Sequence, residues 1–382
     1  MRFIFCLALL ALASCGGQPA REVAPPLAEG AGAWVEVTPQ PTVIDGETVT
    51  PACSGYPGAD PAFRFFAKRG TSDNLVVFFD GGGACWDDAT CSQPRLASGD
   101  VGGGYYKAEL LATDNPANLR GMFDLADPRN PLRDWSMVFV PYCTGDVHSG
   151  ANTHTYRDPR SGREFAIAHR GSDNFRVVLA WMRANFRAPN VILVTGSSAG
   201  AYGAVTQYAR VREAYPNGRA IMFGDAGQGV TTPGFTQARN ENWGYALPRD
   251  VFGDDGLRTD EDSVAILAAH FPNDRFAQYT TAHDRTQVAF YSLMHPANAC
   301  AAWTESMWRD LEAREHIANF RGYLASGETH TILRSPLFYT ERSGGVTFSQ
   351  WLAAMVSENG ADWEDHACVN CLTPPAECPF GR

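Results

Sequence analysis

Short, continuous runs of apolar residues recur along the chain, and segments with a helical pattern lie between them. The runs are rich in β-branched and aromatic residues and do not alternate with polar positions, which is typical of strands buried on both faces of a parallel sheet. Residues 173–186 and 198–215 carry apolar side chains at helical spacing. The predicted strands are residues 75–79, 137–140, 191–194 and 220–223.

Alternating strands and helices indicate β-α-β crossovers. The expected fold is therefore α/β, a doubly wound and mostly parallel central sheet with helices on both faces. Later in the chain, residues 301–324 and 347–358 are predicted to form two more helices. Because no internal repeat and no second clear linker occur, we expect one catalytic domain over residues 35–382.

The first residues have the pattern of an export signal. Arg2 precedes an apolar run that is too short to span a bilayer as a mature helix, and the run ends in Leu12-Ala13-Ser14-Cys15. This ending looks like a bacterial lipobox and predicts a lipoprotein signal peptide over residues 1–14, with Cys15 lipidated. The alternative is an ordinary secretory signal cut nearby. An Ala-, Pro- and Gly-rich stretch follows, so residues 15–34 are expected to form a flexible tether.

Composition and charge narrow the classes of partner. Hydrophobic residues make up 45% of the chain, enough for a large core, and the formal net charge is −11. No run of Lys and Arg supplies the cationic footprint of a nucleic-acid groove. We therefore expect an exported monomer that contacts a membrane only through its N-terminal lipid and binds no nucleic acid.

Export also changes the interpretation of the cysteines. Beyond Cys6 and Cys15 eight remain, and an even number in an oxidising compartment suggests four disulfides. The segment His366-Ala-Cys368-Val-Asn-Cys371 leaves a zinc knuckle or a redox pair as the alternative. The eight cysteines are Cys53, Cys85, Cys91, Cys143, Cys300, Cys368, Cys371 and Cys378.

The strongest chemical signal follows the predicted strand 191–194. There Gly196-Ser197-Ser198-Ala199-Gly200 matches G-x-S-x-G between a strand and a helix, the setting of a nucleophile elbow in α/β-hydrolases. The sharp turn would present Ser198 above the strand ends, with glycines where a Cβ would clash. Ser197 is one residue out of register, and a structural hydroxyl is its expected role.

A serine nucleophile also needs an oxyanion hole, a base and an acid. The loop Asp80-Gly81-Gly82-Gly83-Ala84-Cys85-Trp86 follows an early strand, and the N–H groups of Gly82, Gly83 and Ala199 would form the hole. No Gly-Lys-Ser/Thr follows the loop, so a phosphate-binding Walker loop is disfavoured.

In this fold the acid and then the base follow the serine along the chain. His330 is the predicted base, in a loop that enters an apolar run, and Asp284 is the predicted acid. Asp225 is the second candidate for the acid, with fixation of a loop through backbone N–H groups as its structural alternative. The competing histidines are His270, His283, His295, His316 and His366.

At this point the motifs resemble those of the pectin acetylesterase and Notum family. The similarity runs from about Cys53 to His330. The glycine-cysteine loop and the Asp-Ala-Gly motif are its more particular parts. The motifs, in order, are Asp80-Gly-Gly-Gly-Ala-Cys85-Trp86, Pro141-Tyr-Cys143, Gly196-Ser-Ser198-Ala-Gly200, Asp225-Ala-Gly227 and Asp284-Arg-Thr-Gln287.

The resemblance implies an α/β-hydrolase fold, a Ser198–Asp284–His330 triad and the same oxyanion hole. It also implies the disulfides Cys85–Cys91 and Cys53–Cys143. The chain departs from the family where Asp80 and Ala84 replace the usual Glu and Trp, and in the segment 145–150 followed by His154. These departures lie near the expected substrate pocket.

The proposed reaction is acyl transfer without a cofactor or a metal. Trp86, Asp225 and His148 are the candidates for the substrate pocket; a metal bound by His148 and His154, or a calcium loop over residues 254–262, is the less favoured possibility. Three functions compete: an esterase that removes acetyl or other short acyl groups from a polysaccharide, a general short-chain or lipid-ester hydrolase, and a non-catalytic surface binding module. The intact set of triad and glycine-loop residues favours the first two.

Overall fold

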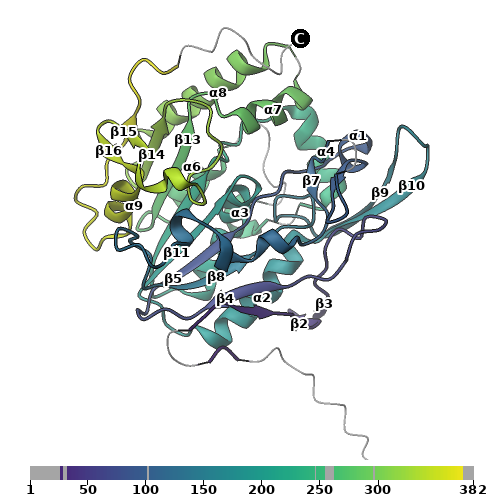
Figure 1. Ribbon diagram of the computed structural model, residues 1–382, viewed down its shortest axis with the longest axis horizontal. Coiled ribbons are helices and arrows are strands. Elements are labelled where there is room, and N and C mark those ends of the chain that lie inside the picture. Colours follow the sequence, from purple (N-terminus) through teal and green to yellow (C-terminus); the bar gives the residue numbers. More distant parts are fainter. Residues whose placement is uncertain are drawn as a thin grey trace, which may run out of the picture.

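The protein is described by a computed structural model that covers residues 26–28, 32–100, 103–245, 247–253, 262–295 and 297–372. Within these residues a nine-stranded sheet crosses the molecule (Figure 1). Its seven strands from β8 to β17 run parallel, whereas β1 and β4 are antiparallel at one edge. In sheet order the strands are β1 (Val35–Val37), β4 (Phe65–Lys68), β8 (Ser136–Val140), β5 (Leu75–Phe79), β11 (Val191–Ser197), β12 (Arg219–Asp225), β13 (Arg275–Thr281), β14 (Phe320–Ala325) and β17 (His366–Ala367).

Both faces of the sheet are covered, as the continuous apolar runs predict. Successive residues of β5 enter two separate cores: Val77 and Phe79 on one face, Val76 and Phe78 on the other. The first core includes residues of α2 (Gly171–Asn185), α3 (Ala199–Ala214), α6 (Ser263–His270) and α8 (Ala299–Arg314). The second includes residues of α9 (Phe348–Val356) and two 3-10 turns, η3 (Gly121–Phe123) and η4 (Pro336–Tyr339).

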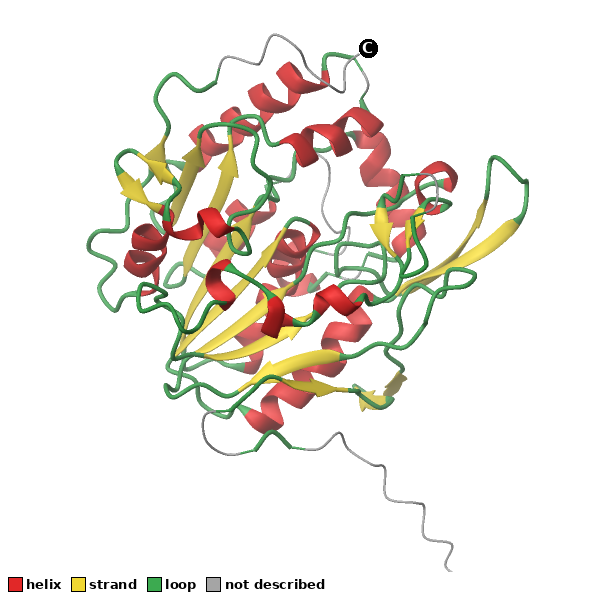
Figure 2. Cartoon of the chain, viewed as in Figure 1, coloured by secondary structure: helices red, strands yellow, loops and turns green. Residues whose placement is uncertain are grey.

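The remaining elements lie around the sheet, and Figure 2 shows the β9–β10 hairpin projecting from the body. They are α1 (Asp88–Cys91), α4 (Pro233–Trp243), α5 (Arg249–Phe252), α7 (Arg285–Met294), η1 (Ala112–Asp114), η2 (Pro116–Asn118), and the strand pairs β9 (Asn152–Arg157) with β10 (Glu164–His169), β2 (Thr42–Ile44) with β3 (Glu47–Val49), β6 (Pro94–Arg95) with β7 (Tyr106–Lys107), and β15 (Arg342–Ser343) with β16 (Val346–Thr347). Among the described residues no helix combines the length and the apolar character needed to cross a bilayer.

The structure confirms the α/β fold and corrects one predicted element. The expected helix over residues 301–324 ends at Arg314, and residues 320–325 instead form the buried strand β14. Between the two, the Asn319 amide donates to the carbonyls of Ala268, Phe271 and Asp274. These contacts link the turn to the end of α6, and tertiary packing there outweighs the local helical pattern.

The described residues contain one disulfide that joins distant parts of the chain and two that close short loops. The predicted pairs Cys53–Cys143 and Cys85–Cys91 are both present, and Cys368 pairs with Cys371. Cys300 is also disulfide-bonded, whereas Cys15 and Cys378 lie outside the described residues. Because Cys368 and Cys371 are bonded to each other, neither thiol is available to a zinc ion.

Removal of the Cys53–Cys143 bond is expected to destabilise the fold strongly, because the bond closes a loop of 90 residues. The chain-entropy model gives a loss of about 4–5 kcal/mol of unfolding free energy for Cys53→Ala with Cys143→Ala. Guanidinium unfolding followed by tryptophan fluorescence measures this loss. An unchanged midpoint in the double variant would contradict the expectation.

Candidate active site

Ser198 lies in a strained turn between β11 and α3. Its φ of 58° and ψ of −124° are unusual for a residue with a side chain and cost about 1–3 kcal/mol. The turn is too tight for side chains at its flanks: a Cβ on Gly196 would lie 2.3 Å from the Gly200 carbonyl oxygen, and one on Gly200 would lie 1.9 Å from that of Phe79. The Ser198 N–H donates to the Asp225 carbonyl oxygen at 2.8 Å. The chain therefore has the predicted elbow geometry.

The elbow belongs to a row of loops at one end of the sheet. Because β5, β11, β12, β13 and β14 are parallel, their carboxyl ends meet at the same edge. The residues after these strands include Asp80, Ser198, Asp284 and His330. This topology brings together four positions spread over 250 residues of sequence.

His330 and Asp284 form a hydrogen-bonded pair. Nδ1 of His330 lies 2.9 Å from both carboxylate oxygens of Asp284. Nε2 of His330 is buried and makes no hydrogen bond to any described residue. Burial alone would lower the pKa of His330, but the charge of Asp284, its hydrogen bond and the charge of Asp225 raise this pKa above its usual value.

Asp284 is held rigidly. It is fully buried and caps the N-terminus of α7, where its side chain accepts hydrogen bonds from the N–H groups of Thr286 and Gln287. The Gln287 side-chain amide donates to its second oxygen at 3.0 Å. Four donors, including His330, thus surround a carboxylate that water does not reach, and its orientation toward the imidazole is fixed.

The glycine loop lies beside the elbow, and a Cβ on Gly81 would lie 3.0 Å from the Ser198 Cβ. Gly83 has a φ of 80°, and a Cβ there would lie 1.9 Å from the Tyr105 carbonyl oxygen. The N–H groups of Gly82 and Gly83 donate to no other described residue. Ala199 is the first residue of α3, where a backbone N–H has no acceptor within the helix.

An ion network that the sequence did not reveal supports this loop. The Asp80 carboxylate is fully buried, and Lys107 Nζ lies 2.5 Å from it and 2.8 Å from Asp114. Arg334, four residues after His330, pairs with the other oxygen of Asp80. Burial opposes ionisation, yet the two cations hold the pKa of Asp80 below its usual value. The network ties the glycine loop to the His330 loop.

Asp225 fixes a loop through backbone N–H groups, which is the structural alternative that the sequence left open for it. It is fully buried and does not line the cavity beside Ser198, so the prediction of a substrate-pocket residue is wrong. Its carboxylate accepts hydrogen bonds from the Ser197 hydroxyl at 2.6 Å and from the N–H groups of Ile332 and Leu333. Burial raises its pKa to about 6. Asp225 thus fastens the loop after His330 to the elbow, and Ser197 has the structural role expected of it.

His148 is also absent from the cavity wall, which corrects the second pocket prediction. Its side chain is buried in the interior, where Nε2 lies 2.8 Å from the Asp80 carbonyl oxygen. Trp86, the third candidate, does line the cavity, and its ring packs against those of Phe235 and Phe290. The sequence could not separate the three because a loop next to a pocket can point its side chains inward or outward.

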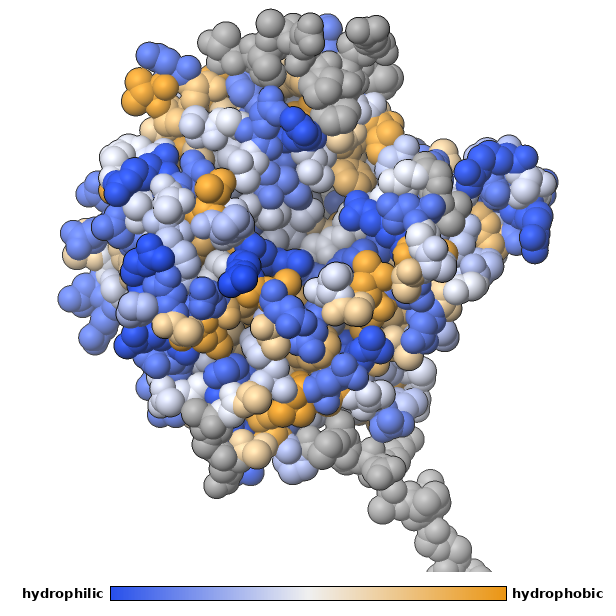
Figure 3. Space-filling model, viewed as in Figure 1, coloured by the Kyte–Doolittle hydropathy of each residue, from blue (hydrophilic) through white to orange (hydrophobic). Residues whose placement is uncertain are grey.

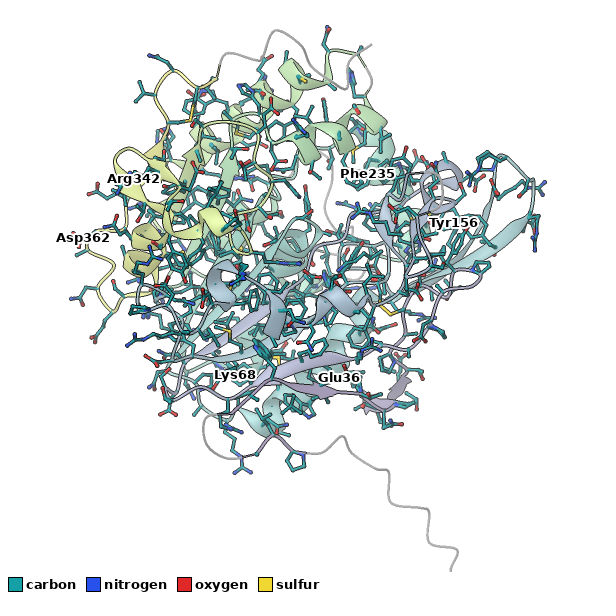
Figure 4. The ribbon with its side chains drawn as sticks, viewed as in Figure 1. Glu36, Lys68, Tyr156, Phe235, Arg342 and Asp362 are labelled. Atoms are coloured by element: carbon teal, nitrogen blue, oxygen red, sulfur yellow. A yellow bond between two sulfur atoms is a disulfide. The ribbon has the colours of Figure 1, made fainter. Side chains whose placement is uncertain are left out.

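The cavity has a volume of about 250 Å³ and contains Ser198, Ala199, Gly83 and His330 in its lining. Gly82 is not part of the lining. Apolar residues from several elements form much of the wall, among them Phe235 of α4, labelled in Figure 4. The outer surface is mixed, and Figure 3 shows hydrophobic residues in separate patches among hydrophilic ones. The apolar wall residues include Trp86, Val147, Val230, Phe235, Phe290 and Met294.

Within the described part of the chain, the side chains that could bind a metal do not gather at the cavity. Of the histidines in the described ranges, His330 is the one that lines it. The one cluster with metal-ligand geometry among those residues comprises Cys85, Cys91 and His169, and its two sulfurs are joined in a disulfide. Residues 254–261 of the possible calcium loop lie outside the described residues.

The chain is similar in sequence to proteins of known function. Pectin acetylesterase 11 of Arabidopsis thaliana is 27% identical over 168 residues, which cover 42% of this chain and 38% of the relative. The palmitoleoyl-protein carboxylesterase NOTUM of Mus musculus is 27% identical over 176 residues, covering 44% and 32%. This chain thus spans less than two fifths of the length of either relative. The family model described as Pectinacetylesterase matches residues 40–247, more than half of the 382 residues. The chain therefore belongs to the pectinacetylesterase family.

Proposed function

We propose that the protein hydrolyses esters through a Ser198–His330–Asp284 triad and removes acetyl or other short acyl groups from a carbohydrate. One observation carries the proposal. His330 is bonded through Nδ1 to a buried carboxylate, its Nε2 is buried and has no partner among the described residues, and His330 lines the same cavity as Ser198. An imidazole in this state has one nitrogen free to accept a proton.

In the proposed reaction the Ser198 oxygen attacks the ester carbonyl carbon while Nε2 of His330 accepts the hydroxyl proton. Asp284 holds the Nδ1–H tautomer and stabilises the imidazolium. The N–H groups of Gly82, Gly83 and Ala199 bind the oxyanion. As the tetrahedral intermediate collapses, His330 gives the proton to the leaving alcohol. Water then attacks the acyl-enzyme by the same steps and releases the acid.

Two hollows share His330 in their walls, and their linings suggest where the acyl group and the alcohol of the ester bind. The apolar cavity with Trp86 and Phe290 suits the acyl group. A second hollow also has His330 in its wall, and its lining is largely polar, which suits an alcohol rich in hydroxyl groups. The residues that line this hollow with His330 are Asn118, Leu119, Arg120, Thr331, Arg334 and Ser335.

A general short-chain or lipid-ester hydrolase is the second candidate. The cavity volume of about 250 Å³ favours it, because an acetyl group would fill only a small part of this space. The polar hollow and the pectin acetylesterase relative favour the carbohydrate substrate.

Hydrolysis of p-nitrophenyl acetate, butyrate and octanoate beside acetylated pectin and xylan tests the proposal, with Ser198→Ala as control. Acetate release from a polysaccharide at a higher kcat/KM than from the nitrophenyl esters supports the carbohydrate substrate. Activity confined to the nitrophenyl esters, and greatest with octanoate, supports the second candidate. Turnover that persists in Ser198→Ala would refute the triad.

Gly83→Ala is expected to lower kcat by about 10²–10³-fold, the loss typical of a missing oxyanion donor. The new Cβ cannot fit 1.9 Å from the Tyr105 carbonyl oxygen, so the loop must shift away from Ser198. Gly46→Ala is a matched control, because Gly46 has a φ of 82° and lies outside the cavity lining, yet a Cβ there meets no atom within 4 Å. Equal losses of kcat in the two variants would argue against a role of the loop in binding the oxyanion.

The pH profile of kcat/KM is expected to fall on the acid side with a midpoint above 6.5. His330 must be neutral to accept the serine proton, and the charge and hydrogen bond of Asp284, against the opposing effect of burial, raise its pKa above that value. Activity is therefore present above this pKa and lost as the pH decreases through it. Initial rates with a nitrophenyl ester between pH 4.5 and 9 measure the midpoint. A flat profile down to pH 5 would contradict the assignment of His330 as base.

We also propose that the protein is exported and anchored through a lipid on Cys15. The proposal rests on residues 1–15, which lie outside the described residues, and is supported by disulfides, which persist in oxidising compartments. Expression with a radiolabelled fatty acid in a bacterial host tests it. Label in the wild type and none in Cys15→Ala is the expected result; an unlabelled wild type would contradict lipidation.

A further inference from the structure

His148 lies in a turn that is costly to form. Val147 and His148 have φ values of 48° and 62°, a region that residues with side chains seldom adopt. Two such residues in succession cost about 1–3 kcal/mol each and persist only where their surroundings impose them. Outliers of this kind concentrate at functional sites. The strained turn at His148 is therefore a candidate for a functional role.

The turn is held from one side by the buried carboxylate of Asp146. This carboxylate accepts hydrogen bonds from the Thr144 hydroxyl at 2.6 Å and from the N–H groups of His148 at 3.2 Å, Gly150 at 3.1 Å and Gly171 at 2.7 Å. Four donors on one buried group leave the backbone at His148 little freedom.

The imidazole itself is packed on its remaining sides. Its ring contacts those of Phe79 and Tyr142, with centroids 5.1 and 4.9 Å away. A Cβ on Gly203 would lie 2.9 Å from the His148 side chain. The Gln207 amide donates to the His148 carbonyl oxygen at 2.7 Å. Both the position and the rotation of the ring are therefore fixed.

The fixed ring directs one nitrogen at the start of the glycine loop. Nε2 lies 2.8 Å from the carbonyl oxygen of Asp80. Burial lowers the pKa of His148 to about 4, so the ring is neutral at pH 7 and carries one proton. Since a carbonyl oxygen can only accept, that proton is on Nε2, and His148 donates it to Asp80.

A second hydrogen bond holds the glycine loop two residues further on, at Gly82. Holding the Asp80 carbonyl fixes the planar Asp80–Gly81 peptide. The Lys107 N–H donates to the Gly82 carbonyl oxygen at 2.9 Å and fixes the Gly82–Gly83 peptide. Between the two lies the Gly81–Gly82 peptide, which carries the Gly82 N–H. Glycines impose little backbone preference of their own, so the direction of this N–H depends on the two fixed planes.

We propose that His148 is a positioning residue for the oxyanion hole: its Nε2–H holds the Asp80 carbonyl and thereby aims the Gly82 N–H. This inference rests on the proposed Ser198 mechanism. It gives His148 a role in the reaction from behind the cavity wall, without contact with the substrate.

The test compares His148→Phe, which keeps a ring but loses the donor, with His148→Gln, whose amide nitrogen can occupy the place of Nε2. A third variant, His148→Asn, tolerates the left-handed backbone but is too short to reach Asp80, and it serves if the phenylalanine variant does not fold. His169→Phe is the matched control: His169 is also buried, and its ring is hydrogen-bonded to Tyr156 and to the Thr144 carbonyl rather than to the backbone of the glycine loop.

The measurements are kcat and KM for p-nitrophenyl acetate and the inhibition constant of a trifluoromethyl ketone, which forms an oxyanion adduct with a serine. His148→Phe and His148→Asn are expected to lower kcat about 10²-fold, the effect of a small misplacement in the site, with KM nearly unchanged. The inhibition constant should weaken by the same factor. His148→Gln should recover most of both, and His169→Phe should keep the wild-type kcat.

Wild-type kcat in the phenylalanine or asparagine variant would overturn the inference, and so would an equal loss in His169→Phe, which would indicate general destabilisation. Failure of the underlying mechanism gives a different result. In that case the ketone would not inhibit the wild-type protein at all.

Discussion

Ser198→Ala is expected to lower kcat by about 10⁶-fold, as the loss of the serine nucleophile does in a triad hydrolase. The residue combines a strained elbow, an adjacent glycine loop and a cavity shared with His330. Adding His330→Ala to this variant should cost almost nothing more, because the two residues act as one unit. The residual turnover is the initial rate of nitrophenyl ester hydrolysis, measured at high enzyme concentration and after any initial burst of product.

The neighbouring hydroxyl offers a matched control for this loss. Ser197→Ala removes a buried hydroxyl that donates to Asp225 at 2.6 Å and is not part of the cavity lining. We expect kcat within about 10-fold of the wild type and a lower melting temperature, the ordinary cost of an interrupted buried hydrogen bond. If Ser197→Ala were the inactive variant and Ser198→Ala active, the elbow register would be wrong.

Asp284→Asn is expected to have the second largest effect and to lower kcat by about 10⁴-fold. An amide at this place can donate to Nδ1, which stabilises the wrong tautomer and leaves Nε2 protonated and unable to accept the serine proton. The fold should survive, because the amide oxygen can still accept from the N–H groups of Thr286 and Gln287. Steady-state kinetics and a thermal melt separate the two effects.

Asp225→Asn distinguishes the two carboxylates that compete for the role of acid. Asp225 accepts hydrogen bonds from the backbone N–H groups of residues 332 and 333. Its effect on the pKa of His330 is that of its negative charge. Its variant should lose stability and retain much of its kcat. The reverse result, a 10⁴-fold loss in Asp225→Asn with an active Asp284→Asn, would transfer the acid role to Asp225.

Sequence patterns predicted the elements that are apolar throughout. Strands β5, β8, β11 and β12 match the predicted runs, because buried parallel strands are continuous in hydrophobicity. Strand β13 was missed, since its buried face includes Gln278, whose amide donates to the Gly227 carbonyl and whose side chain also pairs with Arg314. A polar side chain satisfied by distant partners has no local signature.

In the candidate site, too, features with a local sequence motif could be predicted, whereas contacts between distant residues could not. A short motif with fixed flanks indicated the elbow and the glycine loop, and chain order pointed to Asp284 and His330. The support around them could not be inferred: Lys107 and Arg334 reach Asp80 from 27 and 254 residues away. Likewise, the strained backbone at Val147 and His148 arises from contacts of Asp146 and Gly203, which no periodicity encodes.

Labelling with a fluorophosphonate followed by peptide mass spectrometry identifies the nucleophile. We expect one adduct per chain on the peptide that contains Ser198, none in Ser198→Ala, and a labelling rate reduced by orders of magnitude in His330→Ala. An adduct on another residue, or equal labelling with and without His330, would contradict the proposed nucleophile and its base.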